Sequence, residues 1–433
     1  MDDNKSKRGV MEKRALSHVP EDQRQSWISI AFIWMGIMIC IPMLMVGGIF
    51  STGYSVSTIV LVAAIGFGIC AGVMFFSNNV STDLGLPASM VPVKAFGDKG
   101  ATYITSIVIF VAQTGWFGIQ TATCAVAFNT LLGFADISIP YWVSCIIWGA
   151  VMLFTAVYGF TFMKFLNYIA VPALFAMCIY GVIYATKNVG WDFISSYQPP
   201  AETTMTVAGG ISMTIGLFAG GLVVGGDFAR YSKSRSQTAL SVFVGVLPAA
   251  VFMMFAGAVM ALSAGTSDVT LVFASMGVPA IGMLALILAT WTTNTGNAYS
   301  AGMAVMKVLS LKDERRPLVT MICGGIGIIV AVAGLADALT AFVSLIGALM
   351  PTIAGVVVAD YWIIGRGNPA NWHPVRGFNF CGITAWVIGS AVALKFSFFS
   401  AALDGVIVAA AVYLILYGLL GKTKFGGQGD MAL

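Results

Sequence analysis

The sequence predicts an all-α integral membrane protein with twelve transmembrane helices, and three observations support this fold class. Only 9% of the 433 residues are charged and 58% are hydrophobic, whereas about a quarter of the residues in a soluble domain are charged. Twelve apolar windows, each roughly 18 to 30 residues long, follow one another along the chain. Lysine and arginine are concentrated in alternate connections between these windows. A chain this apolar requires lipid as its solvent.

Each window is long enough to cross a bilayer, which takes about 20 helical residues. The predicted helices span 27–50, 57–80, 101–131, 139–160, 162–186, 205–229, 237–263, 278–309, 317–335, 338–364, 377–396 and 401–420. The polar segments 1–26 and 421–433 are predicted to be tails. The first window is too long for a signal-peptide core and no Ala-x-Ala site follows it, so we expect the N-terminal segment to be retained.

The basic residues predict the orientation of the helices. If the N-terminal tail is cytoplasmic, all of the 22 lysines and arginines except Lys187 and Lys395 lie on the cytoplasmic side. Positive charge is retained on that side of membranes, so we expect an inner (plasma) membrane protein with both termini in the cytoplasm. The net charge of +4 then belongs to this face. It predicts neither a nucleic-acid partner nor an obligate protein partner.

Two halves of the chain share landmarks at a nearly constant offset. Val46-Gly47-Gly48 in the first predicted helix corresponds to Val224-Gly225-Gly226 in the sixth. Because five helices per copy reverse the direction of the second copy, this predicts an inverted repeat of 27–186 and 205–364, followed by two peripheral helices at 377–420. The alternative is chance similarity between glycine-rich apolar segments.

The first and sixth predicted helices carry residues that can interrupt a helix. The first contains Gly36 and Pro42, and proline removes a backbone donor and clashes with the preceding turn. The sixth contains five glycines between residues 216 and 226. These glycines could instead serve close helix packing. Breaks in corresponding positions of two halves favour unwound segments, which place a substrate near the membrane midplane.

Polar and aromatic side chains at membrane depth occur in the third and sixth predicted helices. Gln113 and Trp116 lie three residues apart, on one helix face. Their amide and flat indole suit a planar, neutral, hydrogen-bonding ring, although a packing glutamine beside a structural tryptophan is the alternative. In the sixth helix, Phe218 lies among small residues and could project into a cavity.

The eighth predicted helix carries the polar segment Trp291-Thr-Thr-Asn-Thr-Gly-Asn297. The hydroxyls of Thr292 and Thr293, together with carbonyls of an unwound helix, could form an oxygen cage for a hard cation such as sodium. Asn294 and Asn297 could address the edge of a substrate. The alternative is that the threonine hydroxyls bond to carbonyls of their own helix.

Asp, Glu, Lys, Arg and His are missing from the centres of the predicted spans. Asp227 and Asp360 lie at span ends, and the two histidines, His18 and His373, lie in polar connections. Proton-coupled carriers usually need a titratable group within the membrane, so this absence favours sodium coupling and an uncharged substrate. It also argues against an intramembrane enzyme, because no acid-base pair or nucleophile with its base can be assembled.

At these residues the chain resembles the nucleobase–cation symporter-1 family, and within it the cytosine permeases. The resembling stretches are Gln113-Thr-Gly-Trp-Phe-Gly118, Asp227-Phe-Ala-Arg230, Trp291-Thr-Thr-Asn294, Phe96-Gly-Asp-Lys-Gly100 and Val358-Ala-Asp-Tyr361. The resemblance implies a fold of the leucine-transporter (LeuT) type, with five helices repeated inverted and two peripheral helices. It also implies a secondary transporter that imports a nucleobase or related planar ring, cytosine first, with sodium as the coupling ion.

The resemblance also implies the residues of the site. The expected substrate contacts are Gln113, Trp116, Phe218, Leu217, Asn294, Asn297 and Cys40. The expected sodium ligands are main-chain carbonyls near Gly36, Ile39 and Ala289 and the hydroxyls of Thr292 and Thr293.

The chain departs from the cytosine-permease pattern at three places. It has Thr293-Asn-Thr-Gly-Asn297 where those permeases tend to have Thr-Thr-Asn-Asp-Asn, and Leu217 and Gly220 replace small hydroxyl residues. Lys94 replaces an arginine. The first two changes lie in the expected pocket, so a purine, hydroxymethylpyrimidine, allantoin or hydantoin ring remains open, with sodium or proton coupling. A passive channel and an amino-acid carrier of the same fold are the rival classes.

Overall fold

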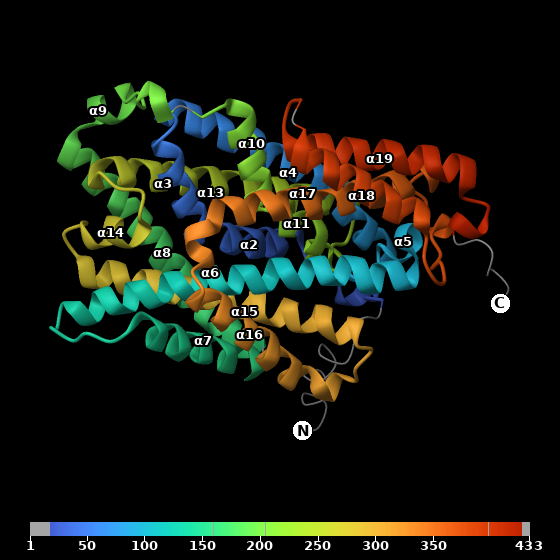
Figure 1. The fold of residues 1–433 in the computed structure, drawn as a ribbon, viewed down its shortest axis with the longest axis horizontal. Coiled ribbons are helices and arrows are strands. Elements are labelled where there is room, and N and C mark those ends of the chain that lie inside the picture. The colour runs from blue at the N-terminus through green and yellow to red at the C-terminus, as the bar shows by residue number, and fades with distance from the viewer. Residues whose placement is uncertain (1–17, 159, 204, 397, 427–433) are drawn as a thin grey trace.

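The helices of this protein form one bundle in which most long helices run roughly side by side (Figure 1). The computed structural model describes residues 18–158, 160–203, 205–396 and 398–426. Most of the predicted N-terminal tail (1–17) and the end of the predicted C-terminal tail (427–433) lie outside the described residues.

The unbroken long helices coincide with ten of the twelve predicted windows. They are α4 (Val56–Leu84), α6 (Ser106–Gly133), α7 (Tyr141–Tyr158), α8 (Phe160–Val189), α13 (Arg235–Ala264), α15 (Pro279–Val308), α16 (Arg316–Val332), α17 (Leu339–Val358), α18 (Phe380–Lys395) and α19 (Ala401–Leu420). Three short helices were not predicted, namely α5 (Val93–Gly100), α9 (Trp191–Ser196) and α14 (Val269–Ala274). They lie in the connections, where a search for long apolar windows cannot find them.

The first predicted span is broken into α2 (Trp27–Met38) and α3 (Ile41–Ser51), which are bent by 52°. The break lies at Ile39 and Cys40, and Cys40 has an extended backbone with φ −143° and ψ 159°. Pro42 lies in the first turn of α3, where its missing N–H would have no helical partner in any case. The predicted break is confirmed. Gly36, however, lies inside α2 and does not interrupt it, because a single glycine can stay helical.

The sixth predicted span is broken in the same way. Its parts are α10 (Val207–Leu217), α11 (Ala219–Val224) and α12 (Gly226–Ala229), and the bend is again 52°. Phe218 forms the break, with φ −112° and ψ 18°. The interruption predicted from the glycines is therefore confirmed, and it falls at the aromatic residue that the sequence had marked.

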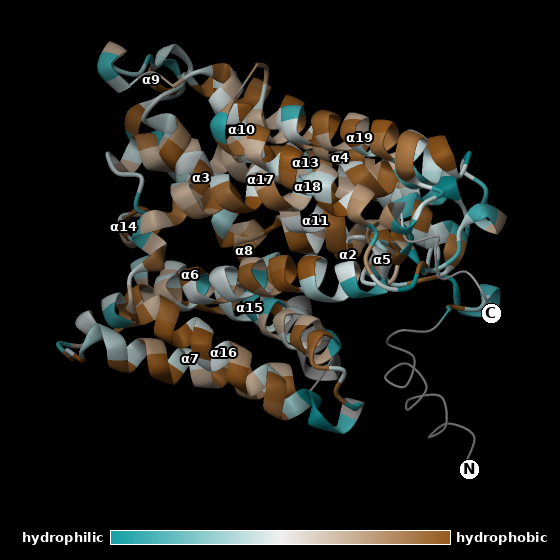
Figure 2. Cartoon of the chain, turned by 45° about the vertical axis from the view of Figure 1, so that its right-hand side comes forward, coloured by the Kyte–Doolittle hydropathy of each residue, from teal (hydrophilic) through white to brown (hydrophobic). Residues whose placement is uncertain are grey.

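The lengths and hydropathies of the helices confirm an all-α membrane protein. Within the described residues, six helices and the two bent pairs are long and apolar enough to cross a membrane. The other four predicted windows coincide with α15 and with the shorter apolar helices α7, α16 and α18. Twelve spans therefore stay a prediction. Figure 2 shows hydrophobic residues along the helices and hydrophilic ones mainly at their ends.

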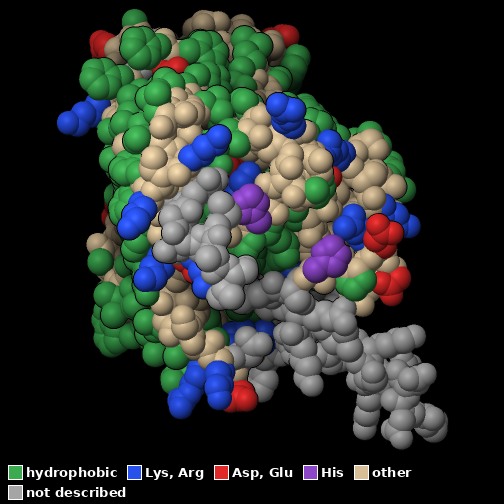
Figure 3. All heavy atoms as spheres, turned by 90° about the vertical axis from the view of Figure 1, so that its right-hand side faces the viewer, with side chains coloured by type: hydrophobic (Ala, Val, Ile, Leu, Met, Phe, Trp, Pro, Cys, Tyr) green, Lys and Arg blue, Asp and Glu red, His purple; other side chains and the backbone are tan. Residues whose placement is uncertain are grey.

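Basic side chains gather on the end of the molecule that lies at the right of Figure 1. Figure 3 looks onto this end and shows Lys and Arg side chains distributed around it. This is the arrangement expected of a face that stays in the cytoplasm. The sidedness of the termini stays a prediction, because the structure contains no membrane.

The bent span α2–α3 is held against α13 by close backbone contact. A Cβ added at Gly47 would overlap the carbonyl of Met254, and one added at Gly257 would overlap the carbonyl of Leu44. Small residues on both helices thus allow the two backbones to touch, as in many membrane interfaces.

We expect Gly257→Ala to lower the free energy of unfolding by about 1–3 kcal/mol, because the added methyl group must push α3 away from α13. Unfolding in detergent micelles measures the effect. Gly72→Ala on α4 is the matched control, since a Cβ there would meet nothing within 4 Å. Equal free energies of unfolding for Gly257→Ala and Gly72→Ala would show that the added methyl group does not disturb the packing of α3 against α13.

Candidate functional site

The aromatic residue at the α10–α11 break is enclosed by other aromatic rings. The Phe218 side chain is 6% exposed. Its ring meets Trp34 of α2 edge-on, with centroids 6.0 Å apart, and Phe67 of α4 at 6.5 Å. Edge-to-face pairs of this kind fix ring orientation. The break between α10 and α11 therefore has a rigid apolar wall.

The side chain of Gln113, on α6, lies beside this break. Its Nε2 atom lies 3.5 Å from the position that a Cβ would take on Gly220, two residues after Phe218. The residue is 7% exposed, and its carboxamide forms no hydrogen bond with the rest of the described chain. An amide without a protein partner has its donors and its acceptor available to a ligand.

Trp116 lies on the same face of α6 but turns towards α17. Its indole, 8% exposed, packs edge-on against Phe342 with centroids 5.4 Å apart. The rings of Trp116 and Phe218 thus have separate aromatic partners and do not stack on each other in this structure. Leu217 and Cys40, which flank the two breaks, are also buried. Of the predicted substrate contacts on these elements, Phe218, Leu217 and Cys40 lie at the two breaks, Gln113 lies beside one of them, and Trp116 packs against α17.

Sequence reasoning missed one residue of this face. Gln120 lies two turns beyond Gln113, is 2% exposed, and its Oε1 atom is buried without a hydrogen-bond partner in the described structure. Thr123, three residues further, contacts Met45 of α3, so this side of α6 faces the first bent span. The seven-residue spacing from Gln113 was the signal that could have found Gln120, since it returns to the same helix face.

The hydroxyls of Thr292 and Thr293 converge on one carbonyl. Their Oγ1 atoms donate to the Ala289 oxygen at 2.8 and 3.1 Å. This is the back-bonding that the sequence left as the alternative. It leaves the oxygen lone pairs of both hydroxyls free to accept a cation. The structure therefore brings Ala289, Thr292 and Thr293 together on one stretch of α15.

The remaining predicted ion ligands lie on the neighbouring bent span. Gly36 is in the last turns of α2, and Ile39 forms the break before α3. Helix α15 contacts α3 directly. Among the described residues, no three His, Cys, Asp or Glu side chains come together as ligands for a metal ion. The oxygen donors here are hydroxyls and carbonyls, which suit a hard cation.

The Asn294 side chain bonds to α6, whereas the sequence predicted that it contacts the substrate. Its fully buried Nδ2 donates to the Phe117 carbonyl at 2.9 Å and to the Thr121 hydroxyl at 3.0 Å, both on α6. Its Oδ1 accepts from Nδ2 of Asn297 at 3.1 Å. The Asn294 amide bonds to α6 because, at this position along α15, it lies beside two buried hydrogen-bond acceptors of that helix. Asn294 thus ties α15 to α6 and positions Asn297, which is only half-buried.

Most of the chain is similar in sequence and in fold to known proteins. Residues 18–420 match the model of a family described as permease for cytosine/purines, uracil, thiamine, allantoin. The chain belongs to this family. The cytosine permease of Escherichia coli (strain K12) is 25% identical to this permease over 376 residues, which cover 86% of this chain and 87% of that one.

Solved structures show that the permease has the LeuT-type fold. The inward-facing conformation of Mhp1 matches with a TM-score of 0.83 and 20% identity over 94% of each chain. Mhp1 in a closed conformation with bromovinylhydantoin bound, described as a nucleobase-cation-symport-1 family transporter, gives 0.81 and 19% over 94% of this chain and 96% of that one. A Na⁺-coupled sialic acid symporter gives 0.69 and 14% over 94% and 93%. The predicted family and fold are confirmed, and the chain is a membrane transporter, not an enzyme.

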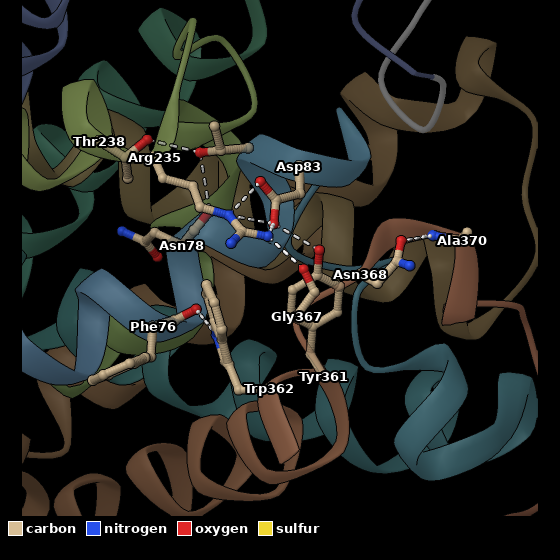
Figure 4. Close-up of polar contacts among 11 residues, drawn as sticks. Phe76, Asn78, Asp83, Arg235, Thr238, Tyr361, Trp362, Gly367, Asn368 and Ala370 are labelled. Carbon is tan, nitrogen blue, oxygen red and sulfur yellow. Dashed lines mark hydrogen bonds and ion pairs between the residues drawn. The ribbon is translucent and has the colours of Figure 1, made fainter. Parts of the chain in front are cut away.

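A polar cluster away from the site joins three helices of the permease (Figure 4). The Asp83 carboxylate at the end of α4 accepts from Arg235 at 2.6 Å and from the Tyr361 hydroxyl at 2.6 Å. The Arg235 guanidinium also donates to the Gly367 carbonyl and lies 4.6 Å from the ring centre of Trp362. These groups come from α4, from the start of α13 and from the chain that follows α17.

The two acidic residues that the sequence placed at span ends both contact the segment 85–100, which connects α4 to α6. Oδ1 of Asp227 accepts from the Ala88 N–H at 2.9 Å. Oδ2 of Asp360 lies 3.3 Å from Nζ of Lys94, with both side chains almost fully buried. Both acidic residues therefore join the end of a span to this connection.

Proposed function

We propose that this permease imports a nucleobase-like planar ring, with cytosine as the first candidate, by sodium symport with alternating access. The observation that carries the proposal is the unpartnered carboxamide of Gln113, which faces the break at Phe218 in a buried site lined by aromatic and amide side chains. A neutral ring with hydrogen-bonding edges complements such a site.

Each residue of the site has a proposed role. Gln113, Gln120 and Asn297 supply hydrogen bonds to the edge of the ring, and Trp116 and Phe218 contact its faces when the site opens to receive it. Leu217 and Cys40 shape the space beside the two breaks. Asn294 acts through Asn297, because its own amide is already bonded to α6.

Sodium would be held by oxygen donors of α15 and of the bent span α2–α3, whose second half, α3, contacts α15. Ala289, Thr292 and Thr293 supply a carbonyl and two hydroxyls from α15, and the carbonyls of Gly36 and Ile39 come from the end of α2. Because ion and ring both contact the broken spans, occupancy of both sites favours the same closed conformation, and this couples their binding.

The same two breaks support the proposed organisation of the chain. Their equal bend of 52°, at corresponding positions, supports an inverted repeat of 27–186 and 205–364 with 377–420 peripheral to it. The basic end in Figure 3 supports cytoplasmic termini and an inner-membrane location. The permease needs the lipid bilayer and no nucleic acid or obligate protein partner for this activity.

Transport into proteoliposomes tests the proposal directly. We expect the purified permease to concentrate radiolabelled cytosine when sodium is higher outside, and to stop doing so when potassium replaces sodium at equal pH. Uptake that does not depend on sodium but is driven by an imposed pH step would indicate proton coupling instead of sodium coupling. Competition by unlabelled uracil, hydantoin and allantoin measures the relative affinity of the permease for each ring.

A hydantoin-like ring is the second candidate. The closed Mhp1 structure of the same fold contains bromovinylhydantoin, and this chain departs from cytosine permeases at Gly296 within the α15 segment. Stronger competition by hydantoin than by cytosine in the uptake assay would favour this ring.

Removing a hydroxyl from the proposed ion site should change the sodium requirement. We expect Thr292→Ala or Thr293→Ala to raise the sodium concentration for half-maximal uptake by about tenfold or more, because an interaction with a charged group contributes about 1.5–3 kcal/mol. The competition ranking of the rings should stay the same. Thr290→Ala is the matched control, since that hydroxyl donates to Leu286 and Ile287 on the same helix. If all three variants behave alike, the ion lies elsewhere.

A further inference from the structure

We infer that Gly220 broadens the range of rings that the site accepts, because it leaves the Gln113 carboxamide free to rotate. The inference rests on the proposed function, since it requires Gln113 to face the substrate. It adds a specificity-determining residue that does not itself supply a hydrogen bond.

Packing does not require glycine at position 220. A Cβ built there would have a single neighbour within 4 Å, the Nε2 atom of Gln113 at 3.5 Å, which is ordinary van der Waals distance. The neighbouring glycines differ in this respect. A Cβ at Gly221 would overlap the Phe218 ring, and one at Gly216 would lie 2.6 Å from the Val343 carbonyl. Position 216 has no room for a side chain because α17 is close, and position 221 has none because the Phe218 ring lies there. At Gly220 the missing side chain leaves space whose one neighbour within 4 Å is Gln113.

A carboxamide has a donor side and an acceptor side, and half a turn about its last bond exchanges them. The Gln113 amide forms no hydrogen bond with the described chain that would fix one orientation. Because residue 220 has no side chain, α11 contributes no polar side-chain group at this point. Gln113 can therefore offer either a donor or an acceptor to the ring.

Cytosine and uracil distinguish a rotating amide from a fixed one. On the same ring edge, cytosine presents an amino donor beside a nitrogen acceptor, whereas uracil presents a carbonyl acceptor beside an N–H donor. A freely rotating Gln113 accommodates both patterns. A serine hydroxyl at position 220 would stand within hydrogen-bond reach of the amide. When it donates its own proton to a carbonyl of the preceding turn, as serines in helices do, it offers only lone pairs to Gln113 and holds the amide with Nε2 towards residue 220. This orientation suits one ring and leaves the other with a mismatched pair.

The experiment compares Gly220→Ser, Gly220→Ala and the wild-type permease. The readout is the ratio of the cytosine and uracil concentrations that give half-maximal thermal stabilisation of the purified protein in sodium. We expect the two concentrations to lie within about tenfold of each other for the wild type. Gly220→Ser should change the ratio by about tenfold or more, which is the effect of one hydrogen bond, and Gly220→Ala should leave it within about threefold.

The outcomes separate the inference from the proposed function. If Gly220→Ser leaves the ratio unchanged, or if Gly220→Ala changes it equally, then residue 220 acts through volume or not at all, and the inference is overturned. If Gln113→Ala leaves the binding of both rings unchanged, the proposed site itself is wrong and the inference falls with it. If the wild type binds neither cytosine nor uracil, the inference is overturned and the hydantoin-like candidate takes the place of cytosine.

Discussion

Replacing Lys94 with methionine should lower the free energy of unfolding by about 3–5 kcal/mol, because it leaves the buried Asp360 carboxylate without its cation. The two side chains are 5% and 3% exposed and their charged atoms are 3.3 Å apart. The Tyr413 hydroxyl donates to the other carboxylate oxygen at 2.8 Å, but one neutral hydrogen bond cannot replace a positive charge in this environment. Unfolding of the purified protein in detergent micelles measures the loss.

Two further variants make this test specific. Lys99→Met removes an exposed lysine from the same short helix α5, and it should change stability little because exposed charges contribute little. The double variant Lys94→Met with Asp360→Leu removes both buried charges and should recover most of the lost stability. Wild-type stability in the Lys94→Met variant would show that the ion pair does not support the fold.

Trp116→Ala should weaken ring binding by about 1–3 kcal/mol, which corresponds to about 5- to 150-fold in affinity, if the indole stacks on the ring as aromatic side chains stack on nucleobases. The measurement is the half-saturation concentration of the ring in the uptake assay at saturating sodium. Trp116→Phe should retain part of the affinity, because a smaller ring still covers one face of the substrate.

A control is needed because Trp116 also packs against Phe342. Trp148 of α7 makes comparable edge-on contacts with Phe128 and Trp291 but lies outside the proposed site. Trp148→Ala should therefore lower stability without a comparable change in ring affinity. Equal losses of affinity in the two alanine variants would assign the effect of Trp116 to packing.

The helices and their two breaks could be predicted because the signals are local. Apolar windows mark the spans, and Pro42 and the glycines around Phe218 mark the places where a helix can end. The face of α6 that carries Gln113 and Trp116 follows from their spacing alone. The short helix α5 could not be found in this way, because it is neither long nor uniformly apolar.

Contacts between distant segments could not be predicted from the same signals. The orientation of the Asn294 amide depends on the register of α15 against α6, which no local pattern encodes. The ion pair of Asp83 with Arg235 joins residues 152 positions apart, and each alone looks like an ordinary charge at a helix end. The seven-residue spacing places Gln120 on the same helix face as Gln113, but only the structure shows that its buried oxygen lacks a partner among the described residues.

The buried contacts of Lys94 also determine when the protein can finish assembling. Its carbonyl oxygen accepts from Asn379, 285 residues later in the chain, and its ion-pair partner Asp360 is held by Tyr413 of the last helix. During synthesis, Lys94 can form these contacts only after residues near the C-terminal end of the chain have been made. Although the two C-terminal helices are peripheral in position, they complete the buried polar contacts of Lys94 and Asp360. A nascent chain therefore reaches its final fold only once these helices have docked.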